Sequence, residues 1–563
     1  MNTFHIFLFL LISFQSVYAQ TGMNDYRQTN PRSIQVDKSE LDNDKLAGVY
    51  YLYPFDNIDR VTPPKGFTPV YISHYGRHGA RYVLTDREYD NVYNVLVSSH
   101  NACVLNDRGE ELYRQYIALY PSFYKRAGDL TTIGQEQHRL IAKRMTQTYP
   151  EIFRSQAIVE AQSTTVPRCI MSMASFCQGL QDNARGVDIS MSTSKSYLSY
   201  LNPYNIENPK VFKGDADSKS SYSKRMMDEF FEANIDVRAF IDRYYADSRY
   251  ALAHYNMDLF MQDLFMVASD MQCLSCDDLS LSKEDIKSLG LDDTERRTNF
   301  FFDYFSREEI LYLWEWENMR FYIEKGPSLT TDGRSYRLSE SLLDELIKRT
   351  DSDLALGTPQ VRLRFGHDAC IMGLYCLMGL DGWGHVTSCP DSVKYCWQSY
   401  NIPMAANLQI IFYRNSKGEV IFRFLHNEHD LTLPLDEYRS NDRIVNTGNH
   451  VRFYLWDDFK SMYEPIVRDA ARFIDLSGKA TIYGQVTVKG KPIGGIAISD
   501  GVSISITDSR GYYFIESSKV SGKVYILPSS RQELMTEESI DRGWIRRLAK
   551  PSSERERVDF VIN

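Results

Sequence analysis

One histidine lies between two arginines in the stretch Ser73-His74-Tyr75-Gly76-Arg77-His78-Gly79-Ala80-Arg81. Because the ordinary pKa of imidazole is close to neutrality, a neutral, nucleophilic ring is readily available at this position. Guanidinium groups present planar forks of N–H donors that match phosphate oxygens. A histidine that attacks phosphorus needs such neighbours. Arg77, His78 and Arg81 therefore predict phosphoryl transfer, with His78 as the nucleophile.

A second chemical motif is Gly366-His367-Asp368, which an apolar segment of helical character follows at 369–380. The N-terminus of a helix attracts an anion. A carboxyl group beside a dianionic phosphate has its pKa raised by the like charge and can hold a proton. We therefore expect Asp368 to be the general acid and His367 to donate to a phosphate oxygen. The alternative is that Asp368 only caps the helix.

Two further segments compete for a part in this chemistry. Arg168 follows Ser163-Thr164-Thr165 and is a candidate third guanidinium, although a surface arginine at a helix start would look the same. The segment His426-Asn427-Glu428-His429-Asp430 contains another carboxyl beside histidines and is the alternative source of the acid. No apolar helix follows it, so we interpret it as a β segment near the end of the domain.

The elements around these motifs predict an α/β fold. Short strands are expected at 67–73, 158–161 and 361–365, directly before Arg77, Arg168 and His367. Open α/β sheets bind ligands at the carboxyl ends of their strands. Helices are expected across 84–150, 171–180 and 456–475, a mostly helical insertion at about 185–350, and a hairpin at 408–425. We predict a mostly parallel-sheet core with a largely helical cap.

The end of the chain has a different character. From residue 480 onward, short alternating strands are separated by turns such as Lys489-Gly490 and Asp500-Gly501. This spacing is typical of a small all-β sandwich. No catalytic constellation is found there, and the sequence does not indicate its partner.

Composition narrows the class of protein. The 563 residues suffice for two or more domains. A net charge of −10 argues against nucleic acid as a partner, so an anionic small substrate would need a local positive pocket. Residues 1–19 read as a secretory signal ending in Val17-Tyr18-Ala19, which predicts a periplasmic or extracellular protein. No later segment reads as a membrane span.

Nine cysteines leave at least one unpaired within a monomer. Cys273 and Cys276 form a single Cys-x-x-Cys, and zinc would require a second such pair. We expect either a local disulfide or two free thiols there. Cys389 and Cys396 lie in one loop-like stretch and could bridge.

Taken together, the motifs resemble those of the histidine acid phosphatases, branch 2 of the histidine phosphatase superfamily, over roughly residues 46–475. Smaller matches to the family are Leu130-Thr131 with Gly134 and Gln137-His138, and Ile402-Pro403-Met404-Ala405-Ala406-Asn407. The resemblance implies that His78 becomes a phosphohistidine, that Arg77, Arg81, Arg168 and His367 hold the phosphoryl oxygens, and that Asp368 protonates the leaving oxygen. It implies neither a metal nor a cofactor, because the arginines neutralise the charge.

This chain departs from the family at two positions. Val83 stands where the family often has proline, and His367-Asp368 stands where the inositol-polyphosphate branch typically has His-Ala-Glu. The tail resembles transthyretin-like or carboxypeptidase-regulatory-like sandwiches. The expected domains are a signal at 1–19, an extension at 20–45, the phosphatase domain at 46–475 and the sandwich at 480–563.

We therefore expect a secreted, metal-independent phosphomonoesterase whose substrate is a small anionic phosphate ester, with inositol polyphosphates such as phytate favoured. One alternative is a phosphoglycerate-mutase-like phosphotransferase, which would not be expected to carry an export signal. The other is a non-catalytic binding protein, which an intact His78 and Asp368 argue against.

Overall fold

The structure is a computed structural model that describes residues 41–562 except 59–60, 154–155, 204–221, 329–334, 381–382, 384–389, 438–450, 478–479, 495, 508–510, 518, 520, 528–543 and 550–555. The predicted signal at 1–19, the extension up to residue 40 and Cys389 lie outside these residues. The chain divides into two compact units, Pro31–Val467 and Arg468–Asn563. Each unit is described by itself.

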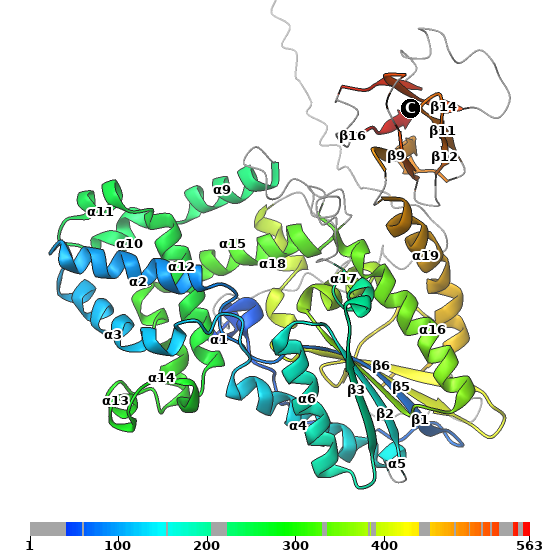
Figure 1. The fold of residues 1–563 in the computed structure, drawn as a ribbon, viewed down its shortest axis with the longest axis horizontal. Helices are drawn as coiled ribbons and strands as arrows, with labels where there is room; N and C mark the ends of the chain where they lie inside the picture. Colours follow the sequence, from blue (N-terminus) through cyan, green and yellow to red (C-terminus); the bar gives the residue numbers. More distant parts are fainter. Residues whose placement is uncertain are drawn as a thin grey trace, which may run out of the picture. The chain divides into compact units, whose positions relative to one another are not determined.

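The first unit is built on a mixed sheet in the order β3-β2-β4-β1-β5-β6-β7, with β8 (Tyr454–Leu455) beside β6 (Figure 1). The strands β3 (Asp188–Thr193), β2 (Ile158–Ser163), β4 (Val361–Gly366) and β1 (Thr68–Arg77) run parallel. Antiparallel pairing begins at β5 (Asn407–Arg414) and continues through β6 (Val420–His426) and β7 (His429–Asp430). The α/β core and the 408–425 hairpin are confirmed, and the half of the sheet that carries the motifs is parallel.

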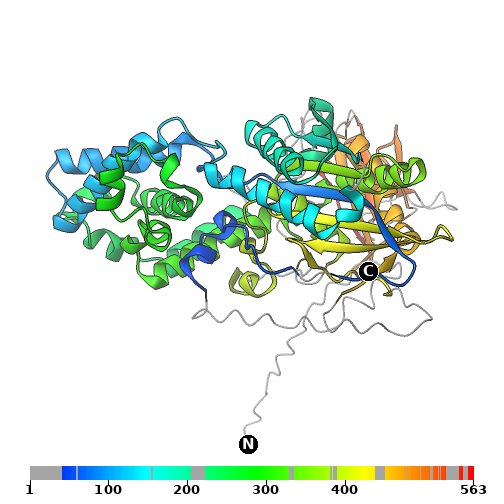
Figure 2. The same cartoon turned by 90° about the horizontal axis from the view of Figure 1, so that it is seen from below.

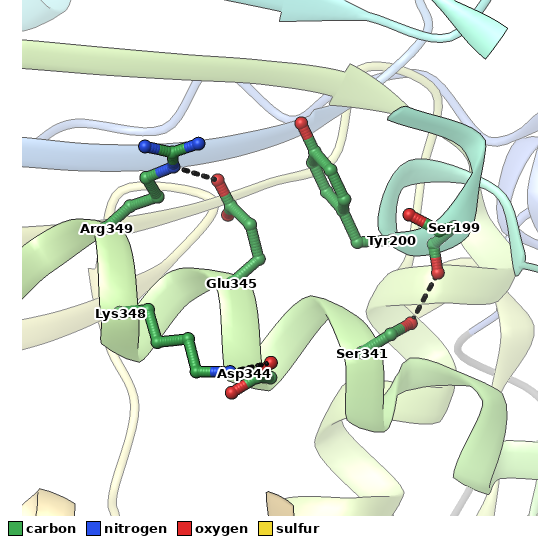
Figure 3. Close-up of a pocket in the computed structure, with 7 residues that line it drawn as sticks. All are labelled: Ser199, Tyr200, Ser341, Asp344, Glu345, Lys348 and Arg349. Carbon is green, nitrogen blue, oxygen red and sulfur yellow. Dashed lines mark hydrogen bonds and ion pairs between the residues drawn. The ribbon is translucent and has the colours of Figure 1, made fainter. Parts of the chain in front are cut away.

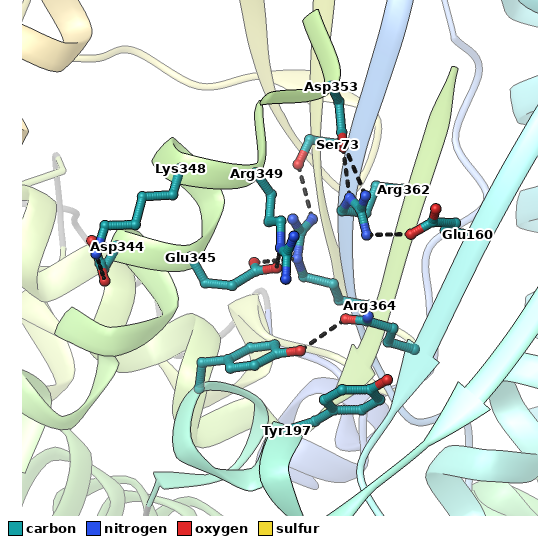
Figure 4. A network of polar contacts seen from close by, with 12 residues as sticks. Ser73, Glu160, Tyr197, Asp344, Glu345, Lys348, Arg349, Asp353, Arg362 and Arg364 are labelled. Atoms are coloured by element: carbon teal, nitrogen blue, oxygen red, sulfur yellow. Dashed lines mark hydrogen bonds and ion pairs between the residues drawn. The ribbon is translucent and has the colours of Figure 1, made fainter. Parts of the chain in front are cut away.

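The two faces of strand β4 pack in different ways. Val361, Leu363 and Phe365 join the apolar core with α4 (Thr132–Thr148) and α6 (Pro167–Asn183). On the other face, Arg362 and Arg364 are buried and make ion pairs rather than apolar contacts (Figure 4).

The ion pairs of β4 connect it to α16 (Glu340–Leu356). Arg362 Nε lies 2.6 Å from Asp353 Oδ2, and Arg364 Nε lies 2.6 Å from Glu345 Oε2. Buried charges of this kind are tolerated only when they are paired. The pairs therefore fix α16 over the strand that leads into Gly366-His367-Asp368.

A group of helices lies away from the sheet (Figures 1 and 2). It contains α2 (Asp86–Asn101), α3 (Asp107–Phe123), α10 (Val237–Asp242), α11 (Ser248–His254) and α12 (Met257–Asp270). Helix α15 (Arg307–Lys325) continues from this group toward the core. The cap thus combines the predicted insertion with α2 and α3, which come earlier in the chain. Helix α2 packs with α12, and α3 packs with α2.

The remaining helices of this unit are short or connect the parts already described. They are α1 (Asn43–Leu46), α5 (Pro150–Phe153), α7 (Leu198–Leu201), α9 (Tyr222–Asn234), α13 (Lys283–Ser288), α14 (Thr294–Asn299), α17 (Asp368–Met378) and α18 (Val393–Cys396). Helix α19 (Trp456–Ser477) follows β8 and ends in the second unit. In the described part of the chain, no helix is long and apolar enough to cross a membrane.

The second unit is all β. One sheet pairs β9 (Ile482–Val488) with β10 (Lys491–Pro492), β13 (Tyr512–Ile515), β16 (Glu556–Arg557) and β17 (Phe560–Ile562). The other has the order β12-β11-β14-β15, formed by Ile504–Ile506, Ala497–Ser499, Lys523–Leu527 and Ile545–Arg547. Apolar side chains from both sheets form one core, which agrees with the predicted sandwich.

Candidate active site

Strands β1 and β4 bring the two predicted motifs together. They are parallel neighbours, and Arg77 at the end of β1 is opposite Gly366 at the end of β4. The His78 backbone N–H donates to the Gly366 carbonyl at 3.0 Å. The His78 and His367 rings lie edge to face with centroids 5.7 Å apart. The carboxyl edge of the sheet is therefore where the predicted nucleophile and the predicted donor meet.

Strand β2 adds the third guanidinium from the other side of β4. Ser163 pairs with Phe365, and the Thr164 backbone N–H donates to the Phe365 carbonyl at 3.1 Å. Helix α6 then begins at Pro167, which places half-buried Arg168 in its first turn. Its charge acts on both histidines of the site. The structure thus gathers all six predicted site residues.

The His78 ring is held in one tautomer. Its Nδ1 lies 2.9 Å from the Gly79 carbonyl oxygen, which can only accept, so Nδ1 carries the hydrogen and Nε2 keeps its lone pair. Burial, with Arg168, Arg77 and Arg81 next in effect, brings the pKa of His78 well below its ordinary value. The imidazole is therefore neutral and its Nε2 is free to attack.

Arg77 and Asp368 form an ion pair within the site. Arg77 NH2 lies 3.0 Å from Asp368 Oδ2, and its NH1 donates to the Val49 and Ile402 carbonyls at 2.8 Å each. Burial alone would raise the pKa of Asp368, but Arg77, then His367 and Arg81, bring it to about 2. The carboxyl is therefore ionised in the free site.

Arg81 is fixed by an aromatic residue that precedes the motif. Its guanidinium lies 4.8 Å from the centre of the Tyr50 ring, and NH1 donates to the Tyr50 hydroxyl at 3.0 Å and to the Tyr82 carbonyl at 2.8 Å. Both side chains are buried. A cation held over an aromatic face keeps its charge, while its side chain is restricted in orientation.

Tyr75 orients the second motif. Its buried hydroxyl accepts from the His367 backbone N–H at 3.0 Å and donates to the Leu201 carbonyl at 3.2 Å. The His367 ring then has its Nε2 3.8 Å from the Cys169 sulfur. Burial, followed by Arg168, lowers the pKa of His367 to about 3, so this ring is also neutral.

The loop after His78 is supported from α4 and α6. The Gly79 N–H donates to Ser172 Oγ at 3.1 Å, and the Ala80 N–H donates to Gln137 Oε1 at 2.9 Å. The Ala80 carbonyl accepts from the Thr131 backbone N–H at 2.9 Å. The sequence indicated Thr131 and Gln137 only as smaller matches to the family. Tyr50 and Ser172 were missed, because the sequence carries no local signal for them.

The carboxyls of the alternative acid segment, residues 426–430, bind other side chains. Glu428 is buried and accepts from Arg144 Nε at 2.8 Å and from the Tyr53 hydroxyl at 3.1 Å. Asp430 makes a two-point pair with Arg423. These bonds explain why carboxyls recur in this β segment, and none of them involves a predicted site residue.

One hollow in the described part of the chain lies away from this site. A space of about 440 Å³ lies between α7 and α16 and is lined by Ser199, Tyr200, Ser341, Asp344, Glu345, Lys348 and Arg349 (Figure 3). Lysine and arginine there face Asp344 and Glu345 one turn away, so the hollow has no net positive charge. It lacks the unpaired cations that a phosphate site needs.

The structure also bears on the cysteines. Cys273, Cys276 and Cys396 are free thiols, so of the two options for the Cys-x-x-Cys the free pair is found. Among the described residues, no group of three or more histidine, cysteine or acidic side chains is arranged to hold a metal ion.

A neutral histidine among three arginines and a carboxyl is an arrangement suited to phosphoryl transfer. The family model for the histidine phosphatase superfamily (branch 2) matches residues 76–427, which is more than half of the chain. The protein therefore belongs to this superfamily. Residues 480–563 match a second model, the N terminal of calcineurin-like phosphoesterase. No curated protein sequence matches the chain.

Solved structures show the same fold. The multiple inositol polyphosphate phosphatase of Bifidobacterium longum, in complex with phosphate, has 17% sequence identity and a TM-score of 0.54, over 74% of this chain and 97% of that chain. Its complex with inositol hexasulfate has 16% identity and a TM-score of 0.53 over the same shares. At such identity the similarity establishes the fold.

Proposed function

We propose that this protein is a secreted histidine acid phosphatase that hydrolyses phosphomonoesters through a phosphohistidine on His78. The observation that carries the proposal is the state of that ring. Nδ1 is held by the Gly79 carbonyl, and the pKa of His78 lies well below its ordinary value through burial and the three arginines. Nε2 is thus a neutral nucleophile in a cationic pocket.

The proposed reaction has two steps. In the first, the Nε2 lone pair forms a bond to phosphorus, the bond from phosphorus to the ester oxygen breaks, and that oxygen takes a proton from Asp368. In the second, Asp368 takes a proton from water, the hydroxyl bonds to phosphorus, and the bond to Nε2 breaks to release inorganic phosphate. Arg77, Arg81, Arg168 and His367 hold the phosphoryl oxygens in both steps.

The ionised state of Asp368 places a condition on the first step. With a pKa of about 2 in the free site, the carboxyl must gain a proton when substrate binds. A dianionic phosphoryl group that pairs with Arg77 would remove the charge that lowers this pKa and add a like charge beside it. Asp368 then acts as an acid only in the complex.

The substrate class we favour is the inositol polyphosphates. The support is the family match together with the fold shared with a multiple inositol polyphosphate phosphatase whose structure holds inositol hexasulfate. We further infer export through residues 1–19, on the basis of the apolar run from Phe4 to Phe14, and separate phosphatase and sandwich domains at 46–475 and 480–563. A mature N-terminus at Gln20 would support the export signal.

Phosphate release from phytate and from sugar phosphates, without added metal, tests the activity. His78→Ala should abolish release in a folded protein, and equal release by both proteins would overturn the proposal. Asp368→Asn should slow turnover by about 10²–10⁴-fold for esters with poor leaving groups and far less for p-nitrophenyl phosphate. Glu428→Gln is the matched control, and the same leaving-group dependence in that variant would move the acid to Glu428.

A further inference from the structure

A buried carboxyl of the cap lies against the loop that carries Arg81. Asp270 is the last residue of α12 and is 1% exposed. The Tyr89 hydroxyl, from α2, donates to its Oδ2, and the same hydroxyl accepts from the Val83 backbone N–H at 3.2 Å. The cap thus reaches the backbone two residues beyond Arg81.

The charges of Asp270 and Arg81 act directly on each other. Arg81 is among the groups that lower the pKa of Asp270, and Asp270 is among those that raise the pKa of Arg81. In the described part of the chain, neither Asp270 Oδ1 nor Arg81 Nε has a hydrogen-bond partner, although both atoms are buried. An unpaired buried oxygen is costly when it is charged.

Several elements in the described part of the chain pack around Asp270 and present titratable groups to it. These groups include Tyr89 of α2, Arg81 and Tyr82 of the loop, Tyr50 of the 3-10 turn at Gly48–Tyr50, and Cys273 and Asp278, which follow α12. Arg81 is the cation among them. When Asp270 is ionised, its counter-charge is therefore the same guanidinium that is proposed to hold the phosphoryl group.

We propose that Asp270 is a positioning residue that competes with the bound phosphoryl anion for Arg81. When Asp270 is neutral, the positive charge of Arg81 interacts with the anion alone. When Asp270 is ionised, it attracts the Arg81 guanidinium and repels the anion. This inference rests on the proposed function, since it requires Arg81 to be part of the anion site.

The direction of the effect follows from linkage. Burial, the largest cause, raises the pKa of Asp270 to about 7. A bound anion favours the protonated carboxyl, so the anion binds more weakly as pH rises through this value. The two site histidines have pKa values well below it and do not change charge there in the free protein. Asp368 is ionised in the free protein and is proposed to gain a proton when a dianion binds, so the test must remove it.

Sulfate is the suitable probe, because it stays a dianion where phosphate changes charge. The full-length protein carries Asp368→Asn in this test, because Asp368 would itself take up a proton when a dianion binds. Calorimetric titration of this protein with sulfate, from about pH 5.5 to about pH 8.5, should show the Kd rising about tenfold, which corresponds to a shift of one pKa unit in Asp270. When Asp270→Asn is added, the Kd should stay constant within about twofold over this range.

Asp263 supplies the matched control. It is a second buried carboxyl on α12, with a pKa raised to about 6, but its partners are Arg87 and Asn91 of α2. Asp263→Asn, added to the Asp368→Asn protein, should keep the pH dependence of that protein. Tyr89→Phe should keep the rise but move its midpoint to higher pH, because the lost hydrogen bond favours the ionised carboxyl.

The experiment distinguishes failure of the proposed function from failure of the role proposed for Asp270. Asp368→Asn protein that binds no sulfate at any of these pH values would overturn the anion site and with it the proposed function. Asp368→Asn protein that binds sulfate with a pH dependence that persists when Asp270→Asn is added, or that is lost equally when Asp263→Asn is added, would overturn the role of Asp270 alone.

Discussion

The contact between Gly79 and Gly134 offers a direct test of how the His78 ring is aimed. A Cβ placed on Gly79 would lie 2.3 Å from the Gly134 carbonyl oxygen and 2.7 Å from its carbonyl carbon and Cα. The contact is with backbone, which cannot rotate away. The substitution Gly79→Ala therefore forces the loop and the first turn of α4 apart.

The size of this displacement sets the expected losses of stability and of catalytic rate. Since Cβ contacts shorter than 3.0 Å are essentially never seen, the two backbones must separate by about 0.7 Å. The Gly79 carbonyl, which orients His78 through Nδ1 at 2.9 Å, would move with the loop. Overpacking costs about 1–3 kcal/mol of stability. Misplacing a reacting group by about 1 Å costs about 10²-fold in rate.

The assay compares kcat/KM for p-nitrophenyl phosphate with the melting temperature of each variant. Gly79→Ala should lower kcat/KM by about 10²-fold while most of the protein stays folded at assay temperature. The control is Gly186→Ala, which has a φ of +77° and no neighbour within 4 Å. It should cost about 1–2 kcal/mol without changing kcat/KM. Wild-type kcat/KM in Gly79→Ala would show that this contact does not aim His78.

Two further predictions concern the histidines. Burial and the arginines keep the pKa of His78 well below its ordinary value, so protonation of this ring should cause no loss of kcat/KM near pH 6.5. A loss of kcat/KM below pH 6.5 that persists in variants of the other titratable residues would contradict this prediction. Tyr75→Phe should leave the buried His367 N–H unpaired, lowering stability by about 1–3 kcal/mol and kcat by about tenfold, as thermal unfolding and steady-state kinetics would show.

Much of the fold was predictable because local patterns and the global fold agree. The strands before Arg77, Arg168 and His367 are β-rich runs bounded by turns, and each is a strand of the structure. Their common edge follows from the rule that parallel strands end together. Strand β1 continues through Arg77, past the predicted end at Ser73, because both of its neighbours, β4 and β5, pair with it along this stretch.

The composition of the cap could not be predicted in the same way. Helices α2 and α3 have ordinary amphipathic patterns, so nothing in α2 shows that it packs with α12, more than 100 residues later, rather than on the sheet, and nothing in α3 shows that it packs with α2. Which element a helix face packs against is decided by the tertiary structure and not by the pattern of the helix itself. For the same reason Tyr89 on α2 and Asp270 on α12 carried no signal, since each became meaningful only once the other lay beside it.

The acidity of the whole chain and the basicity of its site are reconciled by where charges are paired. A net charge of −10 is spread over 74 acidic and 64 basic residues, and the buried arginines of β4 are neutralised by Asp353 and Glu345. At the carboxyl edge of the sheet, Arg77 has Asp368 as its ion-pair partner, while Arg81 is held by Tyr50 and backbone oxygen, which bring no ordinary negative charge. While Asp270 is neutral, an anion that enters this edge therefore meets guanidinium charge that no carboxylate compensates. That is the physical condition that the proposed attack of His78 on phosphorus requires.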